Sequence, residues 1–283
     1  MRCLLVVFAL VLWLHEESVA AGGGGLWGPL LAGAVSSRGG NKRGSPRATD
    51  PEAPVDVSSF DAEGELPLFK TARRLLGKAS PVVALRFCEV HETEGRKRGN
   101  GTLLAWGFDV TSPFEIRMHA QTLSSLGHPY QRLLVTGVAG DCRIVSRFVK
   151  QTALNHTVEF NSFASGAHLA TQLAEFMQSA AMNGDRPLVC HALICSGIDA
   201  TLHSIEPSCQ VTEVTAANAG READLGKRLL DAEYRSNVTL DEALGLARRI
   251  VNPPPKGGAG PDDEKPESKE LGLEFCVIYD DED

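Results

Sequence analysis

The stretch FDAEGELPLFKTARRLLGKASPVVALR, residues 60–86, changes its hydrophobic period halfway along. Over residues 66–76 apolar residues recur every three to four positions, which is typical of a helix with one apolar face. Residues 81–87 are apolar apart from Arg86 and contain two adjacent valines, which favours a strand. The stretch therefore predicts a helix that leads directly into a strand of the core.

The rest of the chain shows strands, two helices, strands, two helices and a last strand. Strands are expected at residues 102–106, 114–118, 132–138, 188–195, 201–205, 211–217 and 273–279. Apolar stripes mark the first helix pair around residues 144–149 and 169–177. The last helix, residues 240–251, follows Thr239 and Glu242 at the spacing of a capping box.

Short links join most of these strands, so the sheets should be mostly antiparallel. Two helix pairs could then cover the outer faces of two stacked sheets. The expected fold is α+β, a four-layer αββα sandwich over residues 60–283. Within it, residues 252–270 are expected to be a flexible loop rich in Pro, Gly and charge, and residues 280–283 an acidic tip.

The composition is that of a folded protein in water, with 43% hydrophobic and 23% charged residues among 283. A formal net charge of −8 argues against a nucleic-acid partner, because phosphate binding needs clustered surplus Lys and Arg. The seven cysteines contain no C-x-x-C pair, so most should be buried apolar side chains. Cys190, His191 and Cys195 lie in a predicted strand, whose side chains alternate between its two faces. The three are therefore expected to be core side chains and not the ligands of a zinc ion. No cofactor or metal is expected.

The N-terminal residues have the pattern of a targeting sequence. In residues 1–21, Arg2 precedes the apolar run Leu4–Leu14, and a small-x-small spacing follows, as in a secretory signal peptide. The run is too short to cross a bilayer as a helix, so no stable membrane span is expected. Residues 22–59 are a low-complexity Gly/Ser/Arg segment, typical either of a transit peptide or of a linker without an address. Together they indicate secretory entry toward a plastid-bounding compartment; the alternatives are a misassigned start codon or a disordered apolar extension.

Three N-x-T sequons, at Asn100, Asn155 and Asn237, are candidate glycosylation sites. They would be used only if the folded chain meets the secretory lumen.

Several motifs together resemble an α-type subunit of the proteasome core particle, which has the N-terminal nucleophile hydrolase fold. Residues 60–86 are similar to the opening helix and first strand of that family. GVAGDCRIV, residues 137–145, looks like its G-L-T-A-D-A-R motif, and DRPLVCHALICSGID, residues 185–199, looks like its R-P…G-x-D motif. The matching residues are Phe60, Gly64, Leu66, Ala72, Gly137, Asp141, Arg143, Arg186, Pro187, Gly197 and Asp199, with Pro207 of a D-P-S-G-like turn and Gly220 after them.

The resemblance implies a structural and gating subunit rather than an enzyme. Its partners would be other α-type subunits in a ring, β-type subunits below and a regulatory particle above. The complex would carry out ubiquitin-dependent degradation in the cytoplasm and nucleus through its β-type subunits. The resemblance assigns the gating and ring segment to Phe60, Gly64, Leu66 and Ala72, and gives the other matching residues structural roles.

Two departures from the family pattern limit this comparison. No lysine lies between Lys97 and Lys150, where family members receive the C-terminal carboxylate of activators, so docking of a regulatory particle does not follow; Arg117 is a weak substitute. Cys209 stands where the family turn has glycine.

Ser80 stands at or beside the threonine nucleophile of catalytic relatives, whose free amine serves as the base. Here Pro81 follows it, Ala79 stands where self-cleavage uses a glycine, and Gly107 replaces the aspartate. We therefore expect a buried or capping serine and a non-catalytic chain. Two alternatives stay open: a divergent N-terminal hydrolase that uses Ser80, and a secreted or plastid-associated relative that does not assemble.

Overall fold

Two antiparallel sheets lie face to face in the computed structural model, which describes residues 60–62, 64–88, 100–108, 122–183, 186–253 and 271–280. One sheet has the strand order β8-β1-β2-β9 and the other β3-β4-β5-β6-β7. The first consists of β8 (Ala216–Ala219), β1 (Val82–Cys88), β2 (Asn100–Phe108) and β9 (Gly272–Tyr279). The second consists of β3 (Leu123–Ser125), β4 (Gln131–Gly137), β5 (Cys190–Ser196), β6 (Thr201–Ile205) and β7 (Val211–Glu213). Neighbouring strands are antiparallel throughout, as predicted.

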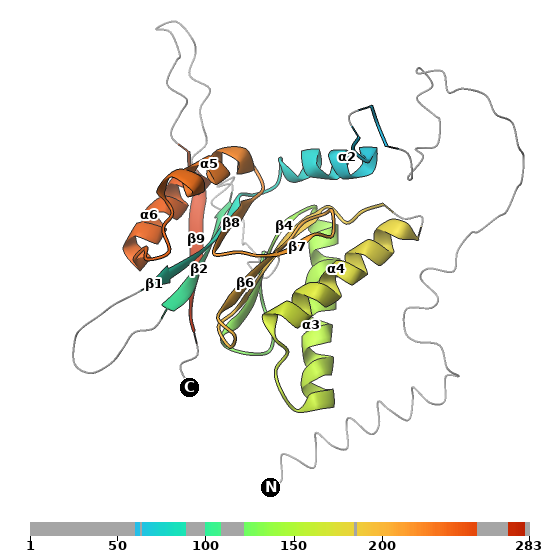
Figure 1. Ribbon diagram of the computed structural model, residues 1–283, viewed down its shortest axis with the longest axis horizontal. Coiled ribbons are helices and arrows are strands. Elements are labelled where there is room, and N and C mark those ends of the chain that lie inside the picture. The colour runs from blue at the N-terminus through green and yellow to red at the C-terminus, as the bar shows by residue number, and fades with distance from the viewer. Residues whose placement is uncertain are drawn as a thin grey trace, which may run out of the picture. The chain divides into compact units, whose positions relative to one another are not determined.

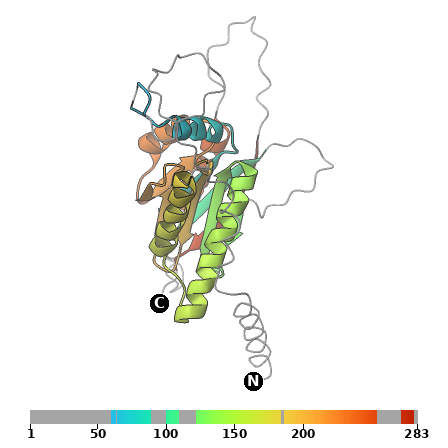
Figure 2. The ribbon, with the colours of Figure 1, turned by 90° about the vertical axis from the view of Figure 1, so that its right-hand side faces the viewer.

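A pair of helices covers the outer face of each sheet (Figures 1 and 2). Helices α3 (Ala139–Phe160) and α4 (Gly166–Met182) pack on the five-stranded sheet. Helices α5 (Ala223–Glu233) and α6 (Leu240–Val251) pack on the four-stranded sheet. The predicted four-layer αββα sandwich is therefore confirmed.

Helix α2 (Pro67–Leu76) lies over one end of the strands and leads into β1 (Figure 1), as the stretch at residues 60–86 predicts. Among the described helices, none has the length and apolar character that a membrane crossing requires.

Alternate residues of a strand fill different layers of the core. On β1, Val82 and Ala84 face the other sheet, whereas Val83 and Leu85 pack in the layer that holds α6. This follows because successive side chains of a strand point to opposite faces. Both faces are buried, which explains why β1 reads in the sequence as a continuous apolar run.

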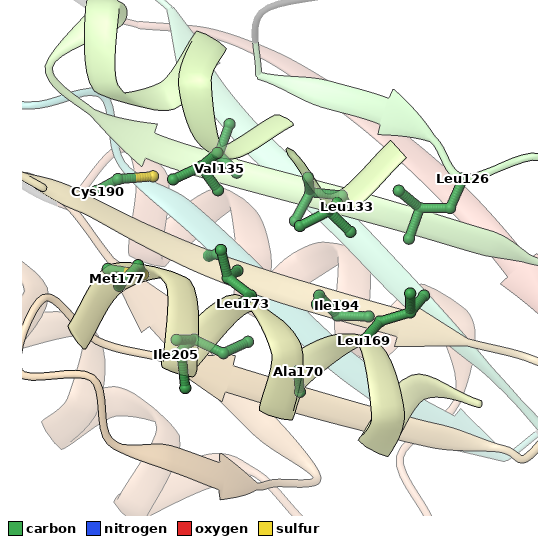
Figure 3. Close-up of a cluster of buried hydrophobic side chains, with 14 of the residues drawn as sticks. Leu126, Leu133, Val135, Leu169, Ala170, Leu173, Met177, Cys190, Ile194 and Ile205 are labelled. Carbon is green, nitrogen blue, oxygen red and sulfur yellow. The ribbon is translucent and has the colours of Figure 1, made fainter. Parts of the chain in front are cut away.

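The layer between the five-stranded sheet and its helices is built in the same way (Figure 3). Leu169, Leu173 and Met177 lie four residues apart and so share one face of α4. They pack against sheet residues such as Val135 and Ile194. Burial of each such side chain contributes about 1.5–3 kcal/mol, so this stripe holds α4 on the sheet.

Helix α6 begins and ends where the sequence predicts, and its capping box is formed. Thr239 Oγ1 accepts the backbone N–H of Glu242 at 3.4 Å, and Glu242 Oε2 accepts that of Thr239 at 2.9 Å. These two bonds satisfy donors that have no partner inside the helix.

The single strand predicted at residues 211–217 is wrong, because this segment forms β7 and β8 in different sheets. The chain crosses between the sheets at Val214 and Thr215. The N–H of Val214 donates to Leu202 O in one sheet, and Thr215 O accepts the N–H of Arg86 from the other. Periodicity could not reveal the crossing, since the backbone stays extended on both sides of it.

The predicted acidic tip begins inside the fold rather than beyond it. Asp280 is half-buried, its carboxylate accepts a hydrogen bond from Arg86 at 2.7 Å, and its N–H donates to Asn100 O at 2.9 Å. Residues 1–59, 114–118, 254–270 and 281–283, on which other predictions fall, lie outside the described residues.

Candidate functional site

The candidate site is the end of the sandwich under α2, together with the segment that precedes this helix. Pro67 occupies the first position of α2, where its fixed backbone angle suits a helix. Ala72 and Leu76 are buried and attach α2 to the rest of the fold. The basic side chains of α2 (Lys70, Arg73 and Arg74) are exposed.

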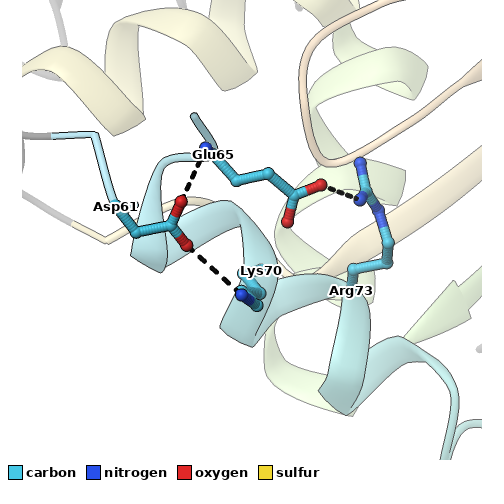
Figure 4. A network of polar contacts seen from close by, with 4 residues as sticks. All are labelled: Asp61, Glu65, Lys70 and Arg73. Carbon is cyan, nitrogen blue, oxygen red and sulfur yellow. Dashed lines mark hydrogen bonds and ion pairs between the residues drawn. The ribbon is translucent and has the colours of Figure 1, made fainter. Parts of the chain in front are cut away.

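Ion pairs connect the segment before α2 to the helix (Figure 4). Asp61 Oδ1 accepts the N–H of Glu65 at 2.8 Å, while its Oδ2 lies 3.2 Å from Lys70 Nζ. Glu65 Oε1 in turn accepts a hydrogen bond from Arg73 at 3.2 Å. Exposed pairs contribute at most about 1 kcal/mol each, so they set the direction of the segment more than its stability.

The four residues assigned to gating and ring contact lie along this same segment. Phe60 is 68% exposed, and Gly64 has φ +80° with open space around it. Leu66 is the half-buried residue that precedes α2, and Ala72 is buried. The arrangement leaves one large apolar ring, Phe60, available to a partner.

Ser80 is exposed, so of the two expected roles, buried or capping, the buried one is wrong. Its main chain, however, is held firmly. Its carbonyl oxygen accepts a hydrogen bond from Thr136 Oγ1 at 2.6 Å, and the carbonyl of Ala79 accepts the N–H of Arg221 at 2.9 Å. Gly220 has φ +93°, and a Cβ there would lie 2.3 Å from Ser80 O. An N-terminal nucleophile would need cleavage between Ala79 and Ser80 to free the Ser80 amine.

Asp141 is the centre of a second polar cluster at this end. Its buried carboxylate accepts two hydrogen bonds from the Arg186 guanidinium, at 2.6 and 2.7 Å, and one from the N–H of Val189 at 2.8 Å. Burial by itself would raise the pKa of Asp141, but the bonds from Arg186 and Val189 outweigh it and lower this pKa below its usual value. The carboxylate therefore fixes the start of α3 to the start of β5.

Three neighbouring motif residues complete this end. Gly137 has φ +147°, and a Cβ there would lie 2.1 Å from Val189 O, so only glycine fits. Pro187 is buried beside the ion pair, and its carbonyl accepts a hydrogen bond from Arg186. Arg143 is exposed on α3. The structure thus brings together Gly137, Asp141, Arg186 and Pro187.

The remaining motif residues lie elsewhere. Gly197 and Asp199 are at the opposite end, where Gly197 N donates to Tyr130 O and Asp199 Oδ2 accepts the N–H of Gly166 at 2.8 Å. Pro207 is buried in the turn after β6, in which Cys209 has φ +66°. A glycine would adopt that angle without strain, so Cys209 keeps the turn at some energetic cost.

The sequons occupy accessible positions on three different elements. Asn100 at the start of β2, Asn155 on α3 and Asn237 in the turn before α6 are all exposed. Arg117 lies outside the described residues.

The described residues contain no group of three or more His, Cys, Asp or Glu that could hold a metal ion. Cys190 packs in the α3/α4 layer and Cys195 between the sheets, so the strand alternation separates them. His191 hydrogen-bonds Ser204 Oγ at 2.8 Å, and burial lowers its pKa to about 4. Its ring is therefore neutral at neutral pH.

Two parts of this arrangement were missed in the sequence. Thr136, which supports Ser80, carries no sequence signal, because its partner is a backbone atom. The pairs Asp61–Lys70 and Glu65–Arg73 span nine and eight positions, so the three- and four-residue spacing of helix charge pairs does not predict them.

Comparison of the sequence with known proteins finds similarity to proteasome subunits, the family that the motifs resemble. Residues 116–253, which include both helix pairs, match the family model described as Proteasome subunit. The chain is similar to Proteasome subunit alpha of Methanocaldococcus jannaschii, with 26% identity over 226 residues that cover 78% of each protein. It is also similar to Proteasome subunit alpha of Picrophilus torridus, with 20% identity over 193 residues, 67% of this chain and 77% of that protein.

Proposed function

This chain is a divergent alpha-type member of the proteasome subunit family, and on that premise we propose that it is a non-catalytic structural and gating subunit of a proteasome core particle. It takes a place in a ring of α-type subunits that stacks on β-type subunits. The complex acts in the cytoplasm and nucleus, where its β-type subunits degrade ubiquitin-marked protein. The signal and transit segments stay predictions, since residues 1–59 lie outside the described ones.

The observation that carries the proposal is helix α2, which lies with its preceding segment over one end of the sandwich. Helix α2 is attached through Ala72 and Leu76, and the ion pairs of Asp61 and Glu65 direct the preceding segment. A segment placed in this way supports a gating role, and Ala79 before Ser80 with Pro81 after it supports a non-catalytic chain. Docking of a regulatory particle is part of the proposal, and exposed Arg74 supplies a positive charge for it.

The test is purification of the tagged full chain from its own cells, followed by mass spectrometry of its N-terminus and of co-purifying proteins. We expect other α- and β-type subunits in one complex and a mature N-terminus that precedes Phe60. A lone chain that begins at Ser80 would support the hydrolase alternative. A lone glycosylated chain that begins near residue 21 would support the secreted relative.

A Ser80→Ala variant separates scaffold from enzyme. In the purified complex we expect its peptidase activity to equal that of the wild type, because the β-type subunits supply the nucleophile. Loss of activity with the complex still intact would assign catalysis to this chain.

A further inference from the structure

Two histidines from different helices meet beside the turn that joins α3 to α4. The ring centroids of His156 and His168 lie 5.1 Å apart, and their planes are inclined by 55°. His156 is in the last part of α3 and half-buried, whereas His168 is exposed in the first turn of α4. Twelve positions separate them in the chain, so only the helix hairpin brings them together.

The tautomer of His156 is fixed by its neighbour. Its Nδ1 lies 3.1 Å from the carbonyl oxygen of Ser162. A carbonyl oxygen only accepts hydrogen bonds, so Nδ1 carries the proton and donates it. In the neutral ring Nε2 then holds a free lone pair. Metal-binding histidines are commonly oriented in this way, with the second ring nitrogen donating to a backbone carbonyl.

The separation of the two rings suits a shared cation. A Zn–N bond of about 2.05 Å places the metal about 3.2 Å from the centroid of each ring, and two such rings at a tetrahedral angle have centroids about 5.2 Å apart. The observed 5.1 Å agrees with this value. The end carbonyls of α3 favour a cation near His156, whereas the first turn of α4 opposes one near His168, so the helix ends together do not decide for or against the ion.

We propose that His156 and His168 form a two-histidine site for a divalent transition metal of the zinc, copper or nickel class. Imidazole ligands select these ions over magnesium and calcium, which prefer oxygen. No third protein ligand is available among the residues that the structure describes, so water or a donor from an incoming molecule completes the coordination. The two ligands come from α3 and α4, and the proposal does not rest on the proposed function.

The test is a calorimetric titration of the purified full chain with Zn²⁺, alongside variants His156→Asn and His168→Asn. We expect one Zn²⁺ bound by the wild type and at least tenfold weaker binding in each variant, because a single imidazole is left. His128→Asn is the matched control, since the His128 ring packs on Phe163 with a centroid separation of 4.3 Å and has no part in the pair. Unchanged affinity in both pair variants would overturn the proposal, since it would place the metal elsewhere, for example on the half-buried thiols.

A second measurement needs no variant and so does not depend on folding of the mutants. Imidazole nitrogen NMR of the wild-type chain should show Zn²⁺ shifting the Nε2 signal of His156, while its Nδ1 proton stays bonded to Ser162. Signals of both rings that do not move at saturating Zn²⁺ would equally overturn the site. Saturating Mg²⁺ is the control ion and should leave both rings unchanged.

Discussion

Two aspartate–arginine pairs, at opposite ends of the sandwich, differ in how the carboxylate is held. Asp141 accepts three hydrogen bonds, two from Arg186 and one from the N–H of Val189. Asp280 accepts one from Arg86, at 2.7 Å. The pKa of Asp141 is lowered, whereas burial raises the pKa of Asp280 and Arg86 only partly offsets it.

The two arginines differ as well. The Arg186 side chain is 59% exposed and stays hydrated, but that of Arg86 is only 19% exposed. The pair at the α2 end therefore buries one charge and surrounds it with donors, while the far pair buries two charges with a single bond between them. The contrast indicates that directed donors, more than opposite charge alone, decide whether the pKa of a carboxylate inside the fold is lowered or raised.

The largest effect is expected from Asp141→Ala. It leaves the N–H of Val189 without its acceptor and frees the start of α3 from β5, which should lower the free energy of unfolding by about 3 kcal/mol. Chemical denaturation of the variant and the wild type measures it. Arg143→Ala, a change of an exposed cation on the same helix, is the control and should stay within about 0.5 kcal/mol. If Asp141→Ala lowered the free energy of unfolding by less than about 1 kcal/mol, the three hydrogen bonds to Asp141 would not hold it more strongly than Asp280 is held.

Replacing both partners sharpens the comparison. Arg86→Met or Asp280→Leu alone leaves one half-buried charge and should cost about 2 kcal/mol, whereas the double variant should recover most of this loss. The equivalent double change at Asp141 and Arg186 should not recover, because the N–H of Val189 stays unsatisfied. Double-mutant cycles by chemical denaturation measure both, and equal recovery at the two ends would contradict the role given to the backbone donor.

The smallest effect is in the pH dependence of stability. Because the pKa of Asp141 is lowered on folding, its contribution is present above the ordinary aspartate pKa and is lost as pH falls through the folded value. Because the pKa of Asp280 is raised, its contribution is largest at low pH and falls as pH rises toward the folded value. Asp141→Asn should therefore weaken the loss of stability on acidification, and Asp280→Asn should strengthen it.

The measurement is the free energy of unfolding of each variant and of the wild type from about pH 3 to pH 6. The slope of this free energy against pH should differ between variant and wild type by less than about 1.4 kcal/mol per pH unit, because each substitution removes one titrating proton. Changes of the same sign in the two variants would show that the pairs are electrostatically alike.

Much of the secondary structure could be predicted because its causes are local. The apolar period of residues 66–76 and Pro67 specify α2, and Thr239 with Glu242 specifies the start of α6. The crossing at Val214 and Thr215 could not be predicted, since an extended segment has the same period in either sheet. The exposure of Ser80 was missed for a similar reason, because strand starts are covered or left open by distant elements.

By itself, the sequence determined the order of helices and strands, the layers that their apolar faces require, and the motifs that resemble one family. Only the tertiary structure decided which distant residues meet. Asp141 joins Arg186 across 45 positions and Arg86 joins Asp280 across 194, and His156 meets His168 through a helix hairpin. The physical reason is that periodicity and capping act within a few residues, whereas these contacts depend on strand register and on how the layers pack.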